Sequence, residues 1–447
     1  MLSASADRAQ LWWWEMTANG HRRVVVTGMG AVTPLGLSVE ENWSHWIAGK
    51  SGIGTISVFD ASEFPVRIAG EVRSFDFDVW KDRRGGLDAA GRSTFFALQA
   101  AEEARRDAGL EDGDHNSERV GLYFAAGDWG INLDGFVATM SSSWGENGQV
   151  VDPAKYVARS RNYLGGQQEH EIQPFMTVRH LVTQLGIEGS VSNCLTACAA
   201  SSQAIGEAFE WIRRGDADIV FSGGSHSMVY PFGIAGFSLL TVLSKRNEEP
   251  QKASRPFDKN RDGFVLSEGA AVLVLEELSH AQKRGAQIYG EVVGYGSTAD
   301  AHRLTDMDPG GDGAQRAIEQ ALRKARVSSD EVDYINAHGT ATRVNDSIET
   351  LVIKKVFGEK AYKIPVSSIK SMLGHLIAAA GATELIACLL SIRDGVVPPT
   401  INYEEPDPDC DLDYVPNKAR ECPVGIALSN SFGFGGQNIC LIVKRYE

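Results

Sequence analysis

Short apolar runs alternate along the chain with longer stretches of helical periodicity. The runs at residues 22–30, 120–125 and 217–224 predict buried strands. At residues 92–108 and 204–215, apolar side chains recur every three to four positions, which predicts helices. Strands that alternate with helices in this way are typical of an α/β fold whose sheets carry helices on both faces.

The same alternation starts again near residue 288. It predicts strands at residues 288–294, 332–337, 364–367, 424–430 and 439–444, and helices at residues 314–325, 346–357 and 374–392. Strands with paired glycines recur in both halves, as Gly28 and Gly30 in the first and Gly294 and Gly296 in the second. We therefore expect a duplicated α/β unit. By contrast, residues 128–166 show little periodicity and predict a long excursion from the fold.

Two motifs that suggest ligands fail on their spacing. Gly28 and Gly30 lack the third glycine of a dinucleotide loop, and Pro34 interrupts the helix that would follow, so we expect a tight turn there. Residues 258–263 resemble a calcium loop, but Gly269 stands where the bidentate carboxylate is needed. The sequence predicts no metal site.

Length and composition set the domain organisation. The chain has 447 residues, of which 43% are hydrophobic, enough for two or three domain-sized units. We expect residues 1–21 to be a disordered N-terminal extension, residues 22–285 to form the first half and residues 286–447 the second. The charged residues of the extension argue against a secretory signal.

Charge and cysteine content narrow the function classes. The formal net charge of −15 argues against nucleic acid as a partner. Six cysteines without a CxxC pair favour a reducing compartment, which we expect to be the cytoplasm. The longest apolar run, residues 376–392, is broken by Gly381 and Glu384 and predicts a core helix, not a membrane span.

Cys198 follows a predicted strand and precedes a predicted helix. A thiol at the first turn of a helix lies beside unpaired N–H groups and the positive end of the macrodipole, and both favour the thiolate. A small buried cysteine explains this stretch equally well when it is taken alone.

Two histidines favour the nucleophile. His338 comes just past a strand end, and His375 stands at the start of a predicted helix, five residues after Lys370. A helix N-terminus disfavours imidazolium, so His375 should stay neutral. The loop at residues 433–436 has exposed N–H groups that can serve as oxyanion donors, and it can also be a hairpin turn.

Four motifs together resemble one family, the β-ketoacyl-acyl-carrier-protein synthases of the thiolase superfamily. They are Thr196-Ala-Cys198, Asn336-Ala-His-Gly-Thr340, Lys370-Ser-Met-Leu-Gly-His375 and Gly433-Phe-Gly-Gly436. The resemblance runs from about residue 22 to the end. It implies a thiolase-like fold with a duplicated five-layered α-β-α-β-α architecture, and an acyltransferase with no bound cofactor. Its substrates would be carried on the phosphopantetheine of an acyl carrier protein, and it would pair with an identical or a related subunit.

The resemblance also implies residue roles. Cys198 would accept an acyl chain, and His338 and His375 would promote decarboxylation of a malonyl unit and stabilise the enolate. Lys370 and Glu349 would form a supporting charged pair around the histidines.

Further roles follow for the entrance of the site. The N–H groups of Cys198 and Phe434 would form the oxyanion hole, with Phe434 as a gate, and Thr340 and Thr342 would bind the pantetheine arm. Arg343 stands where elongation enzymes of the family usually have proline, and this string looks more like type II polyketide ketosynthase subunits. The implied pathway is fatty-acid or type II polyketide assembly.

Two alternatives are weighed against this reading. A thiolase that uses acyl-CoA needs a second cysteine in the C-terminal glycine loop, but residues 433–436 have none and Cys440 lies in a predicted strand. A non-catalytic chain-length partner subunit would lack the nucleophile, whereas this chain has Cys198 and both histidines.

Overall fold

The structure is a computed structural model that describes every residue except 1–20, 84–85, 111–115, 128–131, 146–147 and 149. The N-terminal extension was expected to be disordered over residues 1–21. All of these residues except His21 lie outside the described part. Within the described part, ten strands form one sheet in the order β10-β9-β13-β14-β8-β1-β7-β6-β4-β5. Their bounds are β1 (Val24–Val32), β4 (Val120–Ala126), β5 (Val191–Cys194), β6 (Ile219–His226), β7 (Gly269–Glu277), β8 (Gly290–Ala299), β9 (Tyr334–Asn336), β10 (Val366–Ser367), β13 (Ile426–Gly433) and β14 (Gln437–Lys444). Two small sheets pair β2 (Ile53–Thr55) with β3 (Ile68–Gly70) and β11 (Val396–Val397) with β12 (Arg420–Glu421).

The sheet consists of two equivalent halves. The N-half runs β1-β7-β6-β4-β5 and the C-half β8-β14-β13-β9-β10; in each, the first three strands are antiparallel and the last two run parallel to the third. The halves meet where Val24 to Val26 of β1 pair with residues 290–292 of β8. The predicted boundary after residue 285 falls between α11 (Leu278–Lys283) and β8. The expected duplication is confirmed.

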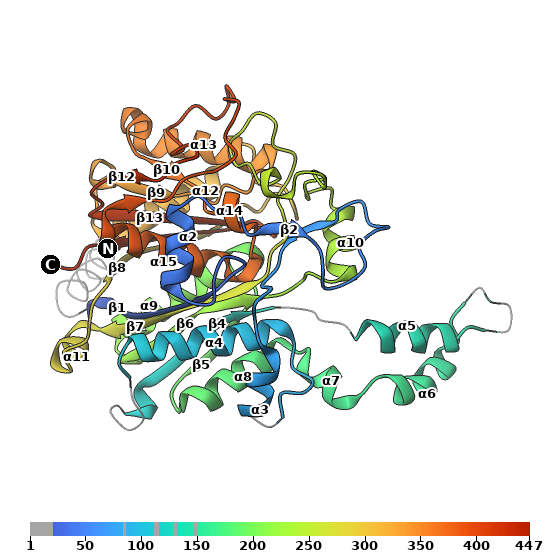
Figure 1. Cartoon of the computed structure of the whole chain (residues 1–447). Coiled ribbons are helices and arrows are strands. Elements are labelled where there is room, and N and C mark those ends of the chain that lie inside the picture. Colours follow the sequence, from blue (N-terminus) through green and yellow to red (C-terminus); the bar gives the residue numbers. More distant parts are fainter. Residues whose placement is uncertain (1–20, 84–85, 111–115, 128–131, 146–147, 149) are drawn as a thin grey trace, which may run out of the picture.

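Helices complete five layers (Figure 1). On the outer faces, α4 (Arg92–Asp107) and α8 (Pro174–Leu185) cover the N-half, and α12 (Asp312–Ala325) with α13 (Arg343–Phe357) packed on it covers the C-half. Between the halves, α9 (Ala200–Arg214) and α15 (Ala380–Asp394) touch each other and strands of both halves. The apolar run at residues 376–392 is thus a core helix, as predicted. Among the described residues, no helix combines the length and the apolar character needed to cross a membrane.

The glycines of β1 do not form the predicted tight turn. They lie inside the strand where α4 approaches: a Cβ on Gly28 would come within 2.3 Å of the Ala104 carbonyl oxygen, and one on Gly30 within 2.0 Å of that of Ala100. Gly296 faces α12 in the same way, with a Cβ 1.9 Å from the Ala317 carbonyl oxygen. The glycines therefore serve close helix–strand packing, and they do so in both halves.

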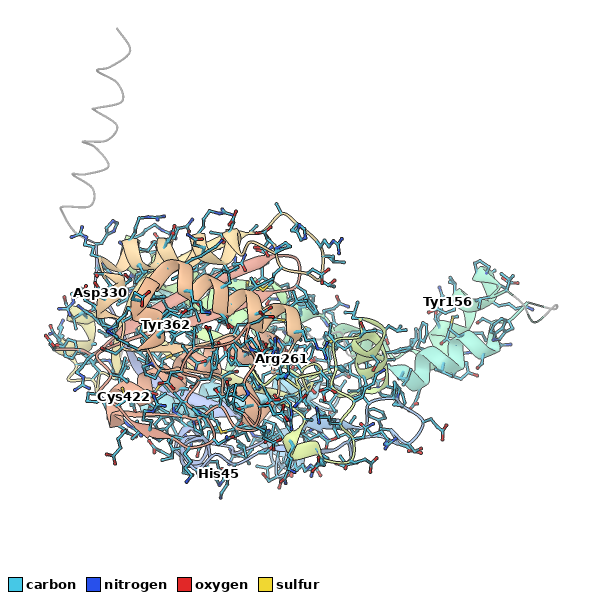
Figure 2. The ribbon with its side chains drawn as sticks, turned by 90° about the horizontal axis from the view of Figure 1, so that it is seen from above. His45, Tyr156, Arg261, Asp330, Tyr362 and Cys422 are labelled. Carbon is cyan, nitrogen blue, oxygen red and sulfur yellow. The ribbon has the colours of Figure 1, made fainter. Side chains whose placement is uncertain are left out.

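The predicted excursion is helical. Its described residues contain α5 (Leu133–Ser142) and α6 (Pro153–Tyr163), which project from the body as an arm (Figure 1), and α7 (Gly166–Glu171) begins where the predicted excursion ends. Tyr156 lies on this arm in Figure 2. None of the α6 residues is buried, so no apolar periodicity marks it in the sequence. The available signal was Asp152, whose carboxylate caps the helix just before Pro153.

The remaining helices are short: α2 (Val39–Ile47), α3 (Phe77–Arg83), α10 (Pro231–Leu239) and α14 (Lys370–Leu373). Some elements begin or end at other residues than predicted. β8 extends to Ala299, past its predicted end at residue 294. α15 begins at Ala380, not at residue 374, because Ile377 has a φ of +45° and a separate 3-10 turn covers Ile377–Ala379.

Candidate active site

Cys198 lies in a tight turn at the centre of the molecule. β5 ends at Cys194, a 3-10 turn covers Ala197–Ala199, and α9 follows directly. Ala197 holds a φ of +47°, a left-handed conformation that costs a non-glycine residue about 1 kcal/mol and that persists because the surrounding structure fixes it. The predicted position of the thiol at a strand–helix junction is confirmed, and its side chain is buried.

The expected thiolate is not favoured. Burial is the strongest influence and raises the pKa of the Cys198 thiol to about 11, against the opposing effects of the Phe434 N–H and the Lys370 ammonium. The position of the thiol near a helix terminus does not offset this desolvation cost. The resting thiol is protonated. Its sulfur nevertheless interacts with the backbone N–H groups of Phe434 and of Cys198 itself.

His338 is held by its backbone. It follows β9, and its N–H and that of Gly339 both donate to the Glu349 carboxylate at 2.8 Å. The Lys370 ammonium donates to the His338 carbonyl oxygen at 2.7 Å and lies 3.4 Å from Nδ1. Because an ammonium only donates, Nδ1 accepts and the imidazole proton sits on Nε2. Burial and the Lys370 charge keep the pKa of His338 well below its usual value.

His375 reaches the same protonation state by another route. The N–H of Ile377 donates to its Nδ1 at 3.2 Å, which leaves the proton on Nε2, and Nε2 is buried without a partner among the described residues. Burial is the main reason why the pKa of His375 lies well below its usual value, with Lys370 second. The predicted neutral state agrees, but its predicted cause does not, since His375 lies in the stretch between α14 and the 3-10 turn instead of at a helix start.

The supporting charged pair has a different partner from the one predicted. Lys370 forms a buried ion pair with Glu384 of α15, not with Glu349. Glu349 instead binds the two backbone N–H groups and accepts from Asn430 Nδ2 at 3.1 Å. In the sequence, Glu384 stands out only as an interruption of an apolar run. A lone acid in a core helix requires a cation, and that signal could have identified it.

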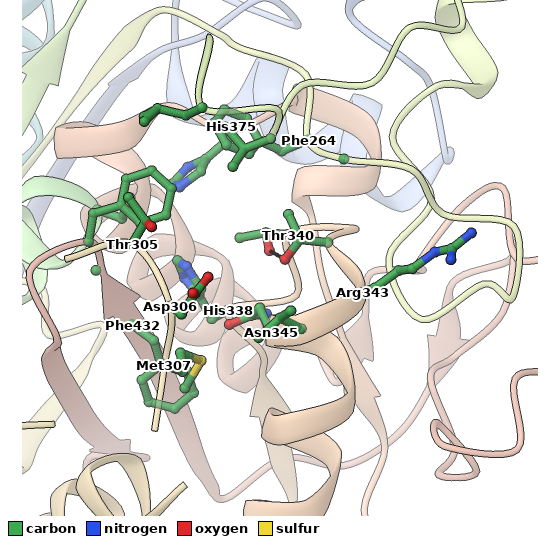
Figure 3. Close-up of a pocket in the computed structure, with 18 of the residues that line it drawn as sticks. Phe264, Thr305, Asp306, Met307, His338, Thr340, Arg343, Asn345, His375 and Phe432 are labelled. Atoms are coloured by element: carbon green, nitrogen blue, oxygen red, sulfur yellow. Dashed lines mark hydrogen bonds between the residues drawn. The ribbon is translucent and has the colours of Figure 1, made fainter. Parts of the chain in front are cut away.

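One cavity of about 350 Å³ joins the predicted residues. Its lining includes all three reactive side chains and the expected entrance residues: Cys198, His338, His375, Thr340, Thr342 and Phe434. The two imidazole rings lie 5.5 Å apart and nearly perpendicular, at 81°. Lys370 and Glu349 lie behind His338 and do not line the cavity. Figure 3 shows the imidazoles on one side of Thr340 and Arg343 on the other.

Several lining residues were not predicted. Phe264 packs edge-on against His375 at 5.2 Å, and Phe432 against His338 at 5.8 Å. The segment from Asp300 to Met307 also borders the cavity, and its Leu304 carbonyl oxygen accepts the N–H of Gly435 at 2.7 Å. The sequence marks this segment only as a loop rich in aspartate and glycine, so nothing in it indicates contact with residues 433–436.

Comparison with known families matches nearly the whole fold. The description "Beta-ketoacyl synthase, N-terminal domain" matches residues 21–281, and "Beta-ketoacyl synthase, C-terminal domain" matches residues 289–404. The first match runs from β1 into α11, and the second runs from the start of β8 to the segment after β11; β12, β13 and β14 lie beyond it.

Two of the curated relatives are equally similar and carry different names. The chain is 42% identical over 432 residues to 3-oxoacyl-[acyl-carrier-protein] synthase 2 of Coxiella burnetii, which covers 95% of this chain and 99% of the relative. It is also 42% identical over 433 residues to the tetracenomycin polyketide synthase ketoacyl synthase alpha subunit of Streptomyces glaucescens, covering 96% and 99%.

Solved structures give the same picture. One match is a chain of a solved complex described as a type II polyketide acyl-carrier protein with its ketosynthase bound to the hexaketide. Its TM-score is 0.84 and its identity 37%, over 95% of this chain and 100% of that chain. The ishigamide ketosynthase/chain length factor matches with a TM-score of 0.84 and 35% identity, over 96% and 100%.

Proposed function

This chain belongs to the β-ketoacyl synthase family, and from that premise we propose that it is a 3-oxoacyl-[acyl-carrier-protein] synthase. It condenses an acyl group held on Cys198 with a malonyl group carried by an acyl carrier protein, in fatty-acid or type II polyketide assembly. It is an acyltransferase of the condensing type. The substrates arrive on the phosphopantetheine arm of the carrier protein.

In the first step, the Cys198 sulfur attacks the thioester of the acyl-carrier protein. The N–H groups of Phe434 and Cys198 donate to the developing oxyanion. The carbon–sulfur bond to the arm breaks, and the thiol proton of Cys198 goes to the departing sulfur. No net proton is consumed, so a protonated resting thiol is compatible with this exchange.

In the second step, the malonyl carboxylate leaves as carbon dioxide and its bonding electrons form an enolate. The Nε2–H groups of His338 and His375 donate to the enolate oxygen, and neither imidazole carries a charge that would protonate the carbanion readily. The carbanion attacks the acyl carbonyl on Cys198. The Cys198 thiolate leaves and takes up a proton, and the 3-oxoacyl chain stays on the arm.

One observation carries the proposal: a buried thiol, two neutral imidazoles with Nε2–H donors and two backbone N–H groups converge on one cavity. The alternatives lack such support. A thiolase needs a second cysteine in the glycine loop at residues 433–436, between β13 and β14, and this loop has none. Cys440 is buried within β14 and does not lie in the loop. A subunit that does not condense has no need of Cys198.

We also propose a paired subunit, identical or related. β5 is an edge strand of the large sheet, and Val191 on it and Leu195 just after it are 44% and 57% exposed. An exposed apolar strand edge favours association with another chain. Sedimentation of the purified protein, alone and with a coexpressed ketosynthase-like subunit, distinguishes the two pairings, and a monomer in both samples would contradict the proposal.

The activity is tested with purified components. Acyl-carrier protein and malonyl-carrier protein are incubated with the enzyme, and intact-protein mass spectrometry should reveal a 3-oxoacyl-carrier product longer by two carbons. Acetyl-CoA alone is the control, since turnover without a malonyl donor would point to a thiolase. Absence of condensation with several carrier proteins, combined with an unacylated Cys198, would support the non-catalytic alternative. Product length with the native carrier protein separates the two pathways.

A further inference from the structure

The residues after His338 line the cavity from its floor to its mouth. Thr340 is buried, Thr342 is half-buried and Arg343 is exposed, although all three line the same cavity. Figure 3 shows Arg343 on the side of Thr340 that faces away from the imidazoles. The rising exposure from Thr340 to Arg343 thus marks the direction in which a bound arm would leave the site.

Arg343 is the cation on the lining of this cavity, which also carries three aspartates. Its lining contains the carboxylates of Asp262, Asp300 and Asp306, and each of these accepts a hydrogen bond, from Ser244, Asn438 and Arg303 respectively. Among the described residues, no hydrogen bond or ion pair involves the Arg343 guanidinium, while both histidines are neutral. The guanidinium is therefore available to an anion that enters.

The backbone beside Arg343 also favours an anion. Arg343 is the first residue of the fifteen-residue helix α13, and the Thr342 side chain makes no capping bond to it. The Thr342 hydroxyl is instead hydrogen-bonded to that of Thr340 at 2.9 Å. The positive end of the helix dipole thus adds to the guanidinium charge at the mouth. Arg261 Nη2 donates to the Arg343 carbonyl oxygen at 3.2 Å and fixes this position.

We propose that Arg343 binds the phosphodiester of the carrier arm. This inference rests on the proposed function, which brings a phosphopantetheine arm into the cavity with its thioester at Cys198. The arm is neutral between its thioester and its phosphate, so the phosphate is the group that a cation at the mouth can read. A guanidinium matches the oxygens of a phosphate in a bidentate geometry. Proline, usual at this position in the family's elongation enzymes, has no charge with which to make this contact.

The test compares thioesters that differ only in the phosphate. Malonyl-phosphopantetheine and malonyl-pantetheine are supplied as extender units to enzyme whose Cys198 is already acylated, and kcat/KM is measured for wild type and Arg343→Gln. A lost charge-assisted contact at an exposed site should lower kcat/KM about tenfold for the phosphorylated substrate, mainly through KM. With malonyl-pantetheine, the variant should match wild type within about twofold, because no phosphate is present.

Controls separate charge from shape and from folding. Arg343→Lys should recover most of the phosphate preference. Arg106→Gln removes an exposed arginine of α4 that does not line the cavity, and it should change neither substrate's kcat/KM. Thermal melting of each variant verifies that the exposed substitutions leave the fold intact.

Each contrary result has its own meaning. Equal losses with both thioesters would overturn the phosphate contact and assign Arg343 a structural role. A loss seen only with intact malonyl-carrier protein would also overturn it, in favour of a contact with the carrier's surface. Wild-type enzyme that turns over no thioester would refute the proposed function instead, independently of Arg343.

Discussion

The two halves contain the same turn with different chemistry. In the N-half, the 3-10 turn Ala197–Ala199 leads into α9; in the C-half, Ile377–Ala379 leads into α15. The φ angles at Ala197 and Ile377 are +47° and +45°, both helices have 15 residues, and each ends at a left-handed glycine. Counterparts are separated by a constant 180 positions. The backbone conformation that presents Cys198 is therefore a property of the duplicated scaffold.

The side chains on this scaffold differ where the chemistry requires it. The counterpart of Cys198 is Ala378, and the counterpart of Glu384, the partner of Lys370, is Ala204. The N-half thus supplies the nucleophile, and the C-half supplies both imidazoles and the ion pair behind them. Conserved geometry alone does not make a site; the residues placed on it do.

The largest expected effect comes from making the two turns alike. Cys198→Ala gives the N-half turn the residue of the C-half turn and should lower condensation by at least about 10⁴-fold, since no covalent acyl intermediate can form. Intact-protein mass spectrometry should detect no acyl adduct. Adding Ala378→Cys to this variant should not restore activity, because that thiol lies in a different environment. Restored turnover would show that the two turns are functionally interchangeable.

The ion pair of the C-half gives the next largest effect. Glu384→Ala leaves the buried Lys370 ammonium without its carboxylate and should reduce the free energy of unfolding by about 3–5 kcal/mol. Urea denaturation measures the change. The double variant Lys370→Met/Glu384→Leu should recover much of that stability while condensation stays impaired. A single variant as stable as wild type would show that the ion pair does not contribute to stability.

Gly30 and Gly296, where a helix packs closely on a strand, test whether the two halves contribute equally to stability. A Cβ on Gly30 or on Gly296 would lie about as close to a helix carbonyl oxygen, at 2.0 and 1.9 Å. We expect Gly30→Ala and Gly296→Ala each to lower the free energy of unfolding by about 1–3 kcal/mol. Gly86 is a surface glycine with no atom near its Cβ position, but its positive φ makes Gly86→Ala less suitable as a control. Gly166→Ala, with open space and no such φ, should be nearly neutral.

The smallest effect concerns the charge of the Cys198 thiol. A dipole-dominated cysteine would reach its full alkylation rate below pH 8, whereas burial raises the pKa here to about 11. The thiol is the favoured form in the folded state, so thiolate appears only as the pH rises towards that value. Iodoacetamide labelling of Cys198 should therefore still increase between pH 8 and pH 10. A rate that levels off near neutrality would show that the helix terminus outweighs burial.

The sequence predicted the order of elements and the reactive side chains well. Cys198 comes shortly after β5 and His338 directly after β9, and both line one cavity with His375. Because β5 and β9 lie in different halves of the sheet and run in opposite directions, the strand ends alone did not predict that these residues meet. The duplicated unit was visible in the repeated glycines of β1 and β8.

What the sequence could not give depends on burial and on contacts between distant segments. The pKa of Cys198 is set by desolvation, which a local helix argument omits. The partner of Lys370 is decided by how α15 packs, and Glu384 and Glu349 are indistinguishable as partners until it does. The arm helix α6 escaped prediction because it buries none of its residues.

The shared middle layer has a consequence for synthesis on the ribosome. α9 packs its apolar face, including Ile205 and Ile212, in the same cluster as Leu385 and Leu389 of α15. Those partners are translated more than 160 residues after α9 ends. At about 5–20 residues per second, the nascent N-half exposes that face for on the order of ten to thirty seconds. During that interval, the apolar face of α9 lacks the α15 side chains that cover it in the folded protein.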